Sequence, residues 1–297
     1  MTAVPLTEKV EKIVGSAPAL AQLRPVIEKE LIHYDIFYVL CRKALIPPEM
    51  AFVGGTCLRL CHGSNRYSED IDFHAGENFQ PKDFERIRSE LESYISGRYG
   101  FETEVRSPKE MKEDSGFANS RESTWKVVIK TGGDRKDLPQ QRINIDIGCL
   151  PAYEVSPQII RTNYQDLPDG YNTMFVRCSS LSEILADKLV ALAARSNIKA
   201  RDLWDILWLR QKGAMLKPDL IRLKIADRGI TERYESLLEN RIDTMPGYFE
   251  KQLFQREMSR FLDRTTLSET VAKPEFLASL SAHITGMLRD IREILYS

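Results

Sequence analysis

The spacing of apolar residues changes near residue 175, and this change constrains the fold of the 297-residue chain more than any other feature. Before it, short apolar runs such as 51–55 (AFVGG) and alternating segments such as 141–150 (QRINIDIGCL) have the patterns of strands, with helical patterns between them. After it, apolar residues recur every three or four positions in one segment after another. We therefore expect an α+β fold, with a mixed central sheet flanked by helices in residues 1–175 and an all-helical half in residues 176–297.

The same patterns predict the individual elements. In the first half, helices are expected over 18–45 and 81–100, and strands over 51–55, 68–75, 101–107, 123–131, 141–150 and 173–178. Residues 108–122 are polar and loop-like, and 151–178 form a loop-rich connection that ends in the last of these strands. In the second half, helices are expected over 181–196, 200–213, 217–228, 231–243, 248–264 and the last twenty residues.

Charge and hydropathy exclude several classes of protein. The formal net charge is −1, so the chain is not a strongly basic nucleic-acid binder overall, although a local basic patch is compatible with this value. No stretch approaches the run of about 18 apolar residues that spans a membrane. The first residues also lack a long apolar run, so we expect no signal peptide and a cytoplasmic protein without a membrane partner.

The five cysteines are odd in number and their spacing is not that of a disulfide framework, so we expect reduced thiols. Cys57, Cys61 and His62 lie close together and invite comparison with a metal site. However, the two cysteines lie four residues apart among leucines. We therefore expect them to lie on the inward-facing side of a helix, in the protein interior.

Two aspartates one residue apart, Asp70 and Asp72, stand in the segment SEDIDF. On a strand, residues i and i+2 project from the same face, with their α-carbons roughly 6–7 Å apart. Two ionised carboxylates in one space repel each other unless a cation lies between them. Mg²⁺ prefers carboxylate oxygens, and such a pair suits the two-ion sites of phosphoryl transfer. The alternative is an edge strand with two solvated aspartates.

The segment FVGGT places Gly54 and Gly55 where a strand ends and a helix begins. Glycine permits backbone conformations and close approaches that a β-carbon forbids. The first turn of the helix offers free N–H groups to a phosphate, and Thr56 adds a hydroxyl. An ordinary tight turn explains the two glycines but not their combination with an acidic pair on the next strand.

A third carboxylate, Asp146, lies in the alternating segment INIDIG. The isoleucines of this segment share one face, and Asn144 and Asp146 share the other. If this strand pairs within the same sheet, Asp146 completes a metal cage. The alternative is a position on a solvated face.

In the helical half, Lys188 falls on the apolar face of LSEILADKLVAL, where a cation requires a partner such as a phosphate or a carboxylate. A lysine whose ammonium reaches water is the alternative. Asp202 and Asp205 lie three residues apart on one face of the next helix and also need partners. Arg195 and Arg201 are near enough in sequence for a purely structural salt-bridge cluster. Trp204 and Trp208 are expected to pack the helical half.

These motifs together resemble a known superfamily. The diglycine turn, the segment SEDIDF and a later lone aspartate on a strand resemble the nucleotidyltransferase fold of DNA polymerase beta. With the second motif, LADKLVALAARSNIKARDLWDI, the chain more specifically resembles the AbiEii/AbiGii toxin family, which includes the mycobacterial MenT toxins. The resemblance implies an enzyme of a toxin–antitoxin or abortive-infection system, a defence against phage.

The resemblance also implies roles for the residues singled out above. Asp70 and Asp72 would bind Mg²⁺, and Asp146 would bind a second ion or accept the proton of the attacking hydroxyl. Lys188 and Asp205 match positions essential for transfer, and Asp202 belongs to the same motif. The nucleotide would contact the turn and basic or hydroxyl side chains around it: Gly54, Gly55, Thr56, Arg59, Arg66, Ser68 and Asp202. Ser68 also matches a serine that is phosphorylated in some relatives, where added negative charge would repel the nucleotide.

For the substrates, the resemblance implies transfer of NMP from an NTP to RNA, at the 3′ acceptor end of tRNA, which blocks translation. It further implies a cognate antitoxin, often a separately encoded transcriptional regulator that need not bind the toxin. Two other hypotheses stay open at this point. One is a nucleotidyltransferase that modifies a small molecule such as an aminoglycoside, and the other is a catalytically silent binding protein that keeps the fold.

Overall fold

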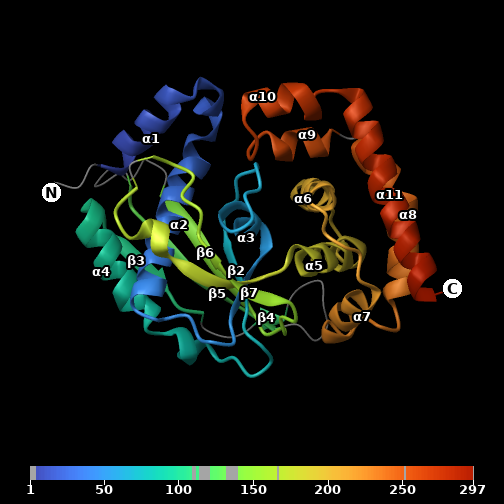
Figure 1. Cartoon of the computed structure of the whole chain (residues 1–297), viewed down its shortest axis with the longest axis horizontal. Coiled ribbons are helices and arrows are strands. Elements are labelled where there is room, and N and C mark those ends of the chain that lie inside the picture. The colour runs from blue at the N-terminus through green and yellow to red at the C-terminus, as the bar shows by residue number, and fades with distance from the viewer. Residues whose placement is uncertain are drawn as a thin grey trace. The chain divides into compact units, whose positions relative to one another are not determined.

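The computed structural model describes residues 5–108, 112–113, 121–131, 140–165, 167–250 and 252–296. The described residues divide into two compact units (Figure 1). The first runs to Lys112 and resumes over Arg121–Cys178, and the second contains Glu113 and the chain from Ser179 onward. Most of the polar segment expected as a loop over 108–122 lies outside the described residues.

A mixed sheet forms the centre of the first unit, as predicted. Its strands follow the order β3-β5-β6-β2-β1-β8-β7, with β4 paired to β5. The pairs β2·β6 and β1·β8 are parallel, whereas β1·β2, β5·β6 and β3·β5 are antiparallel. The strands are β1 (Ala51–Val53), β2 (Ile71–His74), β3 (Thr103–Arg106), β4 (Lys112–Glu113), β5 (Arg121–Ile129), β6 (Gln141–Gly148), β7 (Val155–Ile159) and β8 (Phe175–Ser179).

The helices of the first unit cover this sheet and supply much of its core. They are α1 (Leu6–Ser16), α2 (Arg24–Arg42), α3 (Gly54–Leu60) and α4 (Ile87–Tyr99), with short 3₁₀ turns at Pro18–Leu23, Pro81–Phe84 and Tyr171–Thr173. Phe37 of α2 packs on Phe52 of β1 and Phe73 of β2, with ring centroids 4.7 and 6.3 Å away. The rings join α2 to the two strands that carry the diglycine turn and the acidic pair.

Several expected element boundaries differ from the structure, and three of the differences have a clear local cause. The helix expected over 18–45 starts as a 3₁₀ turn, and α2 begins only at Arg24, because Pro25 lacks an N–H and is tolerated only in the first turn. The loop-rich segment 151–178 contains β7, whose Pro157 is tolerated because β7 is an edge strand. The helix expected over 248–264 is interrupted near Gln252, which has φ of 51°.

The second unit is helical, also as predicted. Its helix α5 contacts α6, α7 and α8, and α11 packs along α8 (Figure 1). The helices are α5 (Leu181–Ala194), α6 (Ala200–Gln211), α7 (Pro218–Asp227), α8 (Tyr234–Phe249), α9 (Leu253–Met258), α10 (Arg264–Thr266), with a π-helical turn at Leu267–Val271, and α11 (Pro274–Tyr296). Trp204 and Trp208 are buried in this unit, as expected. None of the helices in the described parts of the chain has the length and apolar character that a membrane crossing requires.

Candidate active site

The diglycine turn lies directly against the acidic strand. Gly54 starts α3 immediately after the buried strand β1 and has φ of +76°, in the left-handed region that favours glycine. A β-carbon built on Gly54 would lie 2.9 Å from Cγ of Asp72, well inside normal carbon–carbon contact. Two features therefore require glycine at position 54: its backbone conformation and the carboxylate beside it.

Three half-buried aspartates lie on one face of the sheet. Asp72 on β2 pairs in register with Asp146 on the parallel strand β6, so their α-carbons are neighbours about 4.8 Å apart across the ladder. Asp70 precedes β2 on the same face, and the backbone N–H of Asn144 donates to its Oδ1 at 3.4 Å. Ile71 and Ile145, between them on the opposite face, are fully buried. The alternation that places isoleucine in the core thus places the three carboxylates together.

The three carboxylates do not converge as closely as metal ligands do. Within the described ranges, they do not bring one oxygen each to within 4.8 Å of one another. A shared ion therefore requires at least one of the three carboxylates to move.

Thr56 connects the turn to the acidic strand. Its hydroxyl, fully buried, donates to the backbone carbonyl of Asp70. This bond holds the first turn of α3 against the residue that begins the acidic pair. The hydroxyl that the sequence offers to a phosphate is therefore bonded in this structure to the backbone of a predicted metal ligand.

Arg66 and Ser68 pack over the second glycine of the turn. A β-carbon on Gly55 would lie 2.9 Å from Oγ of Ser68 and 3.1 Å from Cζ of Arg66. Both side chains are almost fully buried, and Nη1 of Arg66 donates to the carbonyl oxygen of Tyr67 at 2.9 Å. The structure thus gathers a guanidinium and a hydroxyl at the turn where the sequence predicts phosphate contacts.

Arg59 is engaged elsewhere in the first unit. Its Nε donates to Oε2 of Glu30 at 2.9 Å, and its Nη1 donates to the carbonyl oxygen of Ser64 at 3.2 Å. Its guanidinium also lies over the ring of Tyr67, 4.2 Å from the centroid. Because Glu30 is 1% exposed, Arg59 neutralises a buried carboxylate.

Helix α2 holds the residue that precedes the acidic pair. Nζ of Lys29 pairs with Oε1 of Glu69 at 3.0 Å, and Nε2 of His33 lies 3.0 Å from the carbonyl oxygen of Glu69. Burial lowers the pKa of His33 to about 4, so the ring is neutral and Nε2–H donates to this carbonyl. No sequence motif indicated a role for Glu69, Lys29 or His33. The spacing of four residues between Lys29 and His33 on one helix face is the single local signal that they act together.

In the second unit, Lys188 on α5 lies between two carboxylates of α6. Its Nζ is 2.7 Å from Oδ1 of Asp202 and 2.7 Å from Oδ2 of Asp205. The lysine is 9% exposed and Asp205 is fully buried, so the ammonium does not extend into water. The expectation of a partner for Lys188 is met by the two predicted aspartates themselves.

Asp202 has a second cationic partner. Nη1 of Arg195 lies 3.1 Å from its Oδ2, whereas Arg201 turns to Glu257. Burial by itself would raise the pKa of Asp202, but the positive charges of Lys188 and Arg195 outweigh it and hold this pKa well below its ordinary value. Lys188, Asp202 and Asp205 therefore form a buried ion-pair cluster in which the Asp202 carboxylate is stabilised in its charged form.

A second buried lysine in this unit was not singled out from the sequence. Nζ of Lys224 on α7 lies 2.5 Å from Oε1 of Glu183 and 3.4 Å from Oδ2 of Asp187, both on α5. Lys224 and Glu183 are fully buried. In both clusters a buried lysine pairs with two carboxylates on a neighbouring helix. Lys224 therefore supplies a control for experiments on Lys188.

A mixed sheet with a glycine turn packed against an acidic face, followed by a helical half, is the layout of a nucleotidyltransferase, and the protein is an enzyme of this class. The family model described as nucleotidyl transferase AbiEii toxin, type IV toxin–antitoxin system, matches residues 38–282. Because this match covers most of the chain, the protein belongs to the AbiEii nucleotidyltransferase toxin family. The resemblance drawn from the sequence motifs is confirmed.

Solved structures give more distant likenesses. MenT4, a nucleotidyltransferase toxin from Mycobacterium tuberculosis H37Rv, is 18% identical with a TM-score of 0.48, over 81% of this chain and 72% of that one. JHP933 from Helicobacter pylori is 17% identical with a TM-score of 0.40, over 91% and 93% of the two chains. No curated protein sequence gives a significant match. These likenesses are too distant to transfer the role of any single residue.

Proposed function

We propose that this toxin is a Mg²⁺-dependent enzyme that transfers NMP from a nucleoside triphosphate to the 3′ acceptor end of tRNA and thereby blocks translation. The observation that carries the proposal is the contact between Gly54 and the carboxylate of Asp72, which faces Asp146 in register. It puts the turn that would receive the phosphates beside the acids that would hold the metal.

Asp70, Asp72 and Asp146 are the proposed metal ligands. Three carboxylates on one sheet face are the hard oxygen donors that Mg²⁺ prefers, so the donor set fits this ion. Bound there, Mg²⁺ would offset the negative charge of the phosphates. Asp146 either completes the ligand set or accepts the proton of the attacking hydroxyl, and these roles are separable by experiment.

Around the nucleotide, the proposal assigns the phosphate contacts to the turn and to the side chains packed on it. Gly54 and Gly55 let the chain approach closely, and Arg66 and Ser68 present a cation and a hydroxyl at the same place. Thr56 acts by holding the turn to Asp70. Arg59, predicted as a further phosphate contact, is left out of this set because its charge is already matched by Glu30.

In the helical unit, Lys188 and Asp205 are proposed to act in transfer, as the family motif implies. Two carboxylate oxygens, one from Asp202 and one from Asp205, each lie 2.7 Å from Nζ of Lys188 and hold the lysine in place. The proposed role of Lys188 is to neutralise charge on the phosphates, which requires its ammonium to leave at least one of the two carboxylates that now match its charge. Asp202 then acts by orienting the lysine, with Arg195 offsetting its remaining charge.

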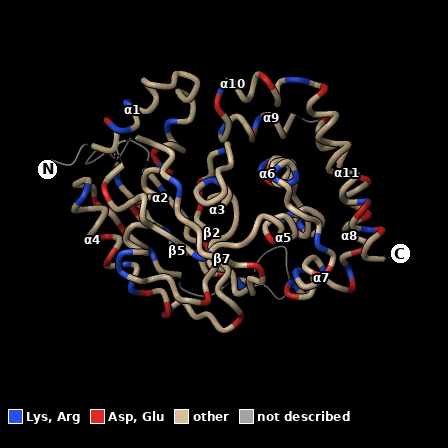
Figure 2. Tube along the Cα trace, viewed as in Figure 1, with Lys and Arg blue, Asp and Glu red and all other residues tan. Residues whose placement is uncertain are grey.

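For the acceptor, support comes from the toxin family and not from overall charge. Lysine and arginine alternate with aspartate and glutamate along both units instead of separating into long blocks (Figure 2). With a formal net charge of −1, binding to tRNA would depend on local basic positions. Family membership further implies a cognate antitoxin, and we propose that the pair acts in defence against phage.

The test is direct. Purified protein is incubated with total tRNA and each α-labelled nucleoside triphosphate in turn, with Mg²⁺ or with a chelator. The proposal expects label in tRNA with at least one nucleotide, dependent on Mg²⁺, and no transfer by Asp70→Ala. Growth arrest on expression of the wild type should be absent for the same variant.

Two results would count against the proposal. Label in an aminoglycoside with tRNA untouched would assign the enzyme to small-molecule modification. Undiminished transfer or growth arrest by Asp70→Ala would remove the acidic strand from the reaction. To separate inactivity from unfolding, the melting temperature of each variant is measured in parallel.

A further inference from the structure

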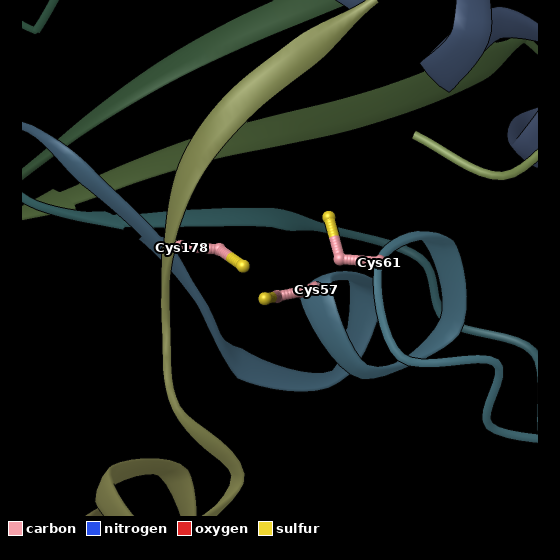
Figure 3. A group of neighbouring side chains, drawn as sticks. All are labelled: Cys57, Cys61 and Cys178. Carbon is pink, nitrogen blue, oxygen red and sulfur yellow. The ribbon is translucent and has the colours of Figure 1, made fainter. Parts of the chain in front are cut away.

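Three buried thiols meet between helix α3 and strand β8, two elements that are far apart in the sequence. Cys57 lies in α3, Cys61 follows one turn later with its N–H bonded to the carbonyl of Cys57, and Cys178 comes from β8 (Figure 3). The three sulfur atoms lie within 4.8 Å of one another, and the side chains are 0%, 7% and 0% exposed. Among the described residues, no other group of three potential metal-binding side chains has its ligand atoms this close together.

A fourth candidate donor lies beside one of the three sulfurs. Nε2 of His62, the residue after Cys61, lies 3.7 Å from Sγ of Cys178. In a tetrahedral zinc site with Zn–S of about 2.3 Å and Zn–N of about 2.05 Å, neighbouring sulfur and nitrogen ligands are about 3.6 Å apart, and two sulfurs about 3.8 Å apart. The distance from His62 to Cys178 already matches, and the sulfurs need to approach by no more than about 1 Å. His62 lies outside the set of ligand atoms that are all within 4.8 Å of one another, so its partly exposed ring also has to turn toward the sulfurs of Cys57 and Cys61.

We propose that Cys57, Cys61, Cys178 and His62 form a structural binding site for Zn²⁺. A donor set of three thiolates and an imidazole selects zinc among the common divalent ions, whereas Mg²⁺ prefers oxygen. Each thiol gives its proton to solvent when it binds the metal. His62 is partly exposed and gives the ion a path from solvent.

The surroundings suit the charge of such a site. Three thiolates and one Zn²⁺ leave a net charge of −1. The guanidinium of Arg161 packs against Gly63, next to His62, with its Nη1 3.1 Å from the position of a β-carbon on Gly63. The backbone N–H of Arg161 also donates to the carbonyl of Leu60, at the end of α3. A cation is therefore held beside the cluster by the fold itself.

The ion would fasten α3 to the sheet. Cys178 pairs with Phe52 on the parallel strand β1, two residues before Gly54, and Cys57 follows Gly54 by three residues. A bond from both cysteines to one ion therefore spans the turn that carries the two glycines. The site takes no part in the transfer itself, and its presence does not depend on the proposed substrate.

The first experiment measures metal directly. Protein purified without chelator is analysed for zinc by elemental analysis, and protein stripped of metal is titrated with Co²⁺. We expect close to one zinc per chain, and Co²⁺ spectra with thiolate-to-metal charge-transfer bands and the ligand-field bands of tetrahedral coordination. Cys57→Ser and Cys178→Ser should lose stoichiometric binding, and His62→Ala should change the Co²⁺ spectrum.

Cys149→Ser is the matched control. Cys149 is also a buried thiol of the first unit, 6% exposed, but lies outside the group. This variant should keep the zinc content of the wild type. It should also keep the fall in melting temperature on addition of a chelator, which should be absent in Cys178→Ser.

If the serine variants fail to fold, the wild type alone decides. With zinc bound, alkylation of Cys57, Cys61 and Cys178, followed by mass spectrometry, should be slow until chelator is added, whereas the rates at Cys41 and Cys149 should not change. The proposal is overturned if stripped protein does not bind zinc, if bound Co²⁺ shows no thiolate bands, or if protein purified without oxidant contains a disulfide within the group.

Discussion

Replacing Gly54 by alanine is expected to lower the rate of nucleotidyl transfer about 100-fold or more while the protein stays folded. Two separate costs arise at this position. The backbone has φ of +76°, where an L-residue with a β-carbon is disfavoured by about 1–2 kcal/mol. The new β-carbon would also lie 2.9 Å from Cγ of Asp72, so the carboxylate has to move.

The size of this movement sets the expected loss. Carbon atoms in normal contact lie about 3.5–4.0 Å apart, so Asp72 must shift by about 1 Å. A misplacement of about 1 Å in a reacting site costs on the order of 100-fold in rate. We therefore expect the rate of transfer by Gly54→Ala to fall about 100-fold or more, with a stability loss of about 1–2 kcal/mol.

Gly76 offers the matched control. It follows β2, has φ of +74°, and would place its β-carbon in open space with no heavy atom within 4 Å. Gly76→Ala should lose a similar amount of stability and keep its transfer activity. The assay compares initial rates of label transfer to tRNA with urea unfolding curves of the two variants. Equal activity of the two, or an active Gly54→Ala protein, would show that the contact with Asp72 has no catalytic consequence.

Three further outcomes are expected. Either substitution, Lys188→Met or Lys224→Met, leaves buried carboxylates without their cation and should lower the free energy of unfolding by about 3–5 kcal/mol. The rate of transfer per folded molecule should fall only for Lys188→Met. If it falls equally for both, Lys188 is structural. The pKa of His33 is about 4 in the folded protein and 6.5 ordinarily, so the unfolded chain binds more protons than the folded one between pH 4 and pH 6.5. The free energy of unfolding should therefore decrease by about 2 kcal/mol from pH 7 to pH 5. In urea titrations at several pH values, His33→Gln should weaken this dependence of stability on pH. Asp146→Asn should lower the rate of transfer at least about tenfold. If high Mg²⁺ partly restores the rate, Asp146 is a metal ligand, and if it does not, Asp146 is the proton acceptor.

Local spacing accounts for the parts of the site that were predictable. Asp70 and Asp72 share a face because side chains alternate along any strand, and this holds whatever the neighbouring strands are. Gly54 and Gly55 mark a change from strand to helix through conformations that glycine alone adopts easily. Lys188 stood out because a cation on an apolar helix face needs a partner. The division into domains near residue 175 remains a prediction, since compact units need not fold independently.

Pairings between distant segments were not predictable in the same way. The alternation of INIDIG indicated which face Asp146 occupies, but not that it stands beside Asp72, because register depends on which strands pair. The same holds for Cys178, which lies 117 residues after Cys61 and joins it through the pairing of β8 with β1. Without that third sulfur, Cys57 in α3 and Cys61 just after it had the pattern of core residues.

The sequence by itself determined the fold class, the acidic pair, the diglycine turn and the family, because each depends on residue types at short and regular spacing. The tertiary structure alone decided which groups are neighbours: Asp146 beside Asp72, Arg59 on Glu30, His33 on the carbonyl of Glu69, and Cys178 with the thiols of α3. The physical reason is the range of the interactions. Backbone conformation and periodicity act over a few residues, whereas the contacts of buried charges and thiols are set by how strands and helices far apart in the chain pack together.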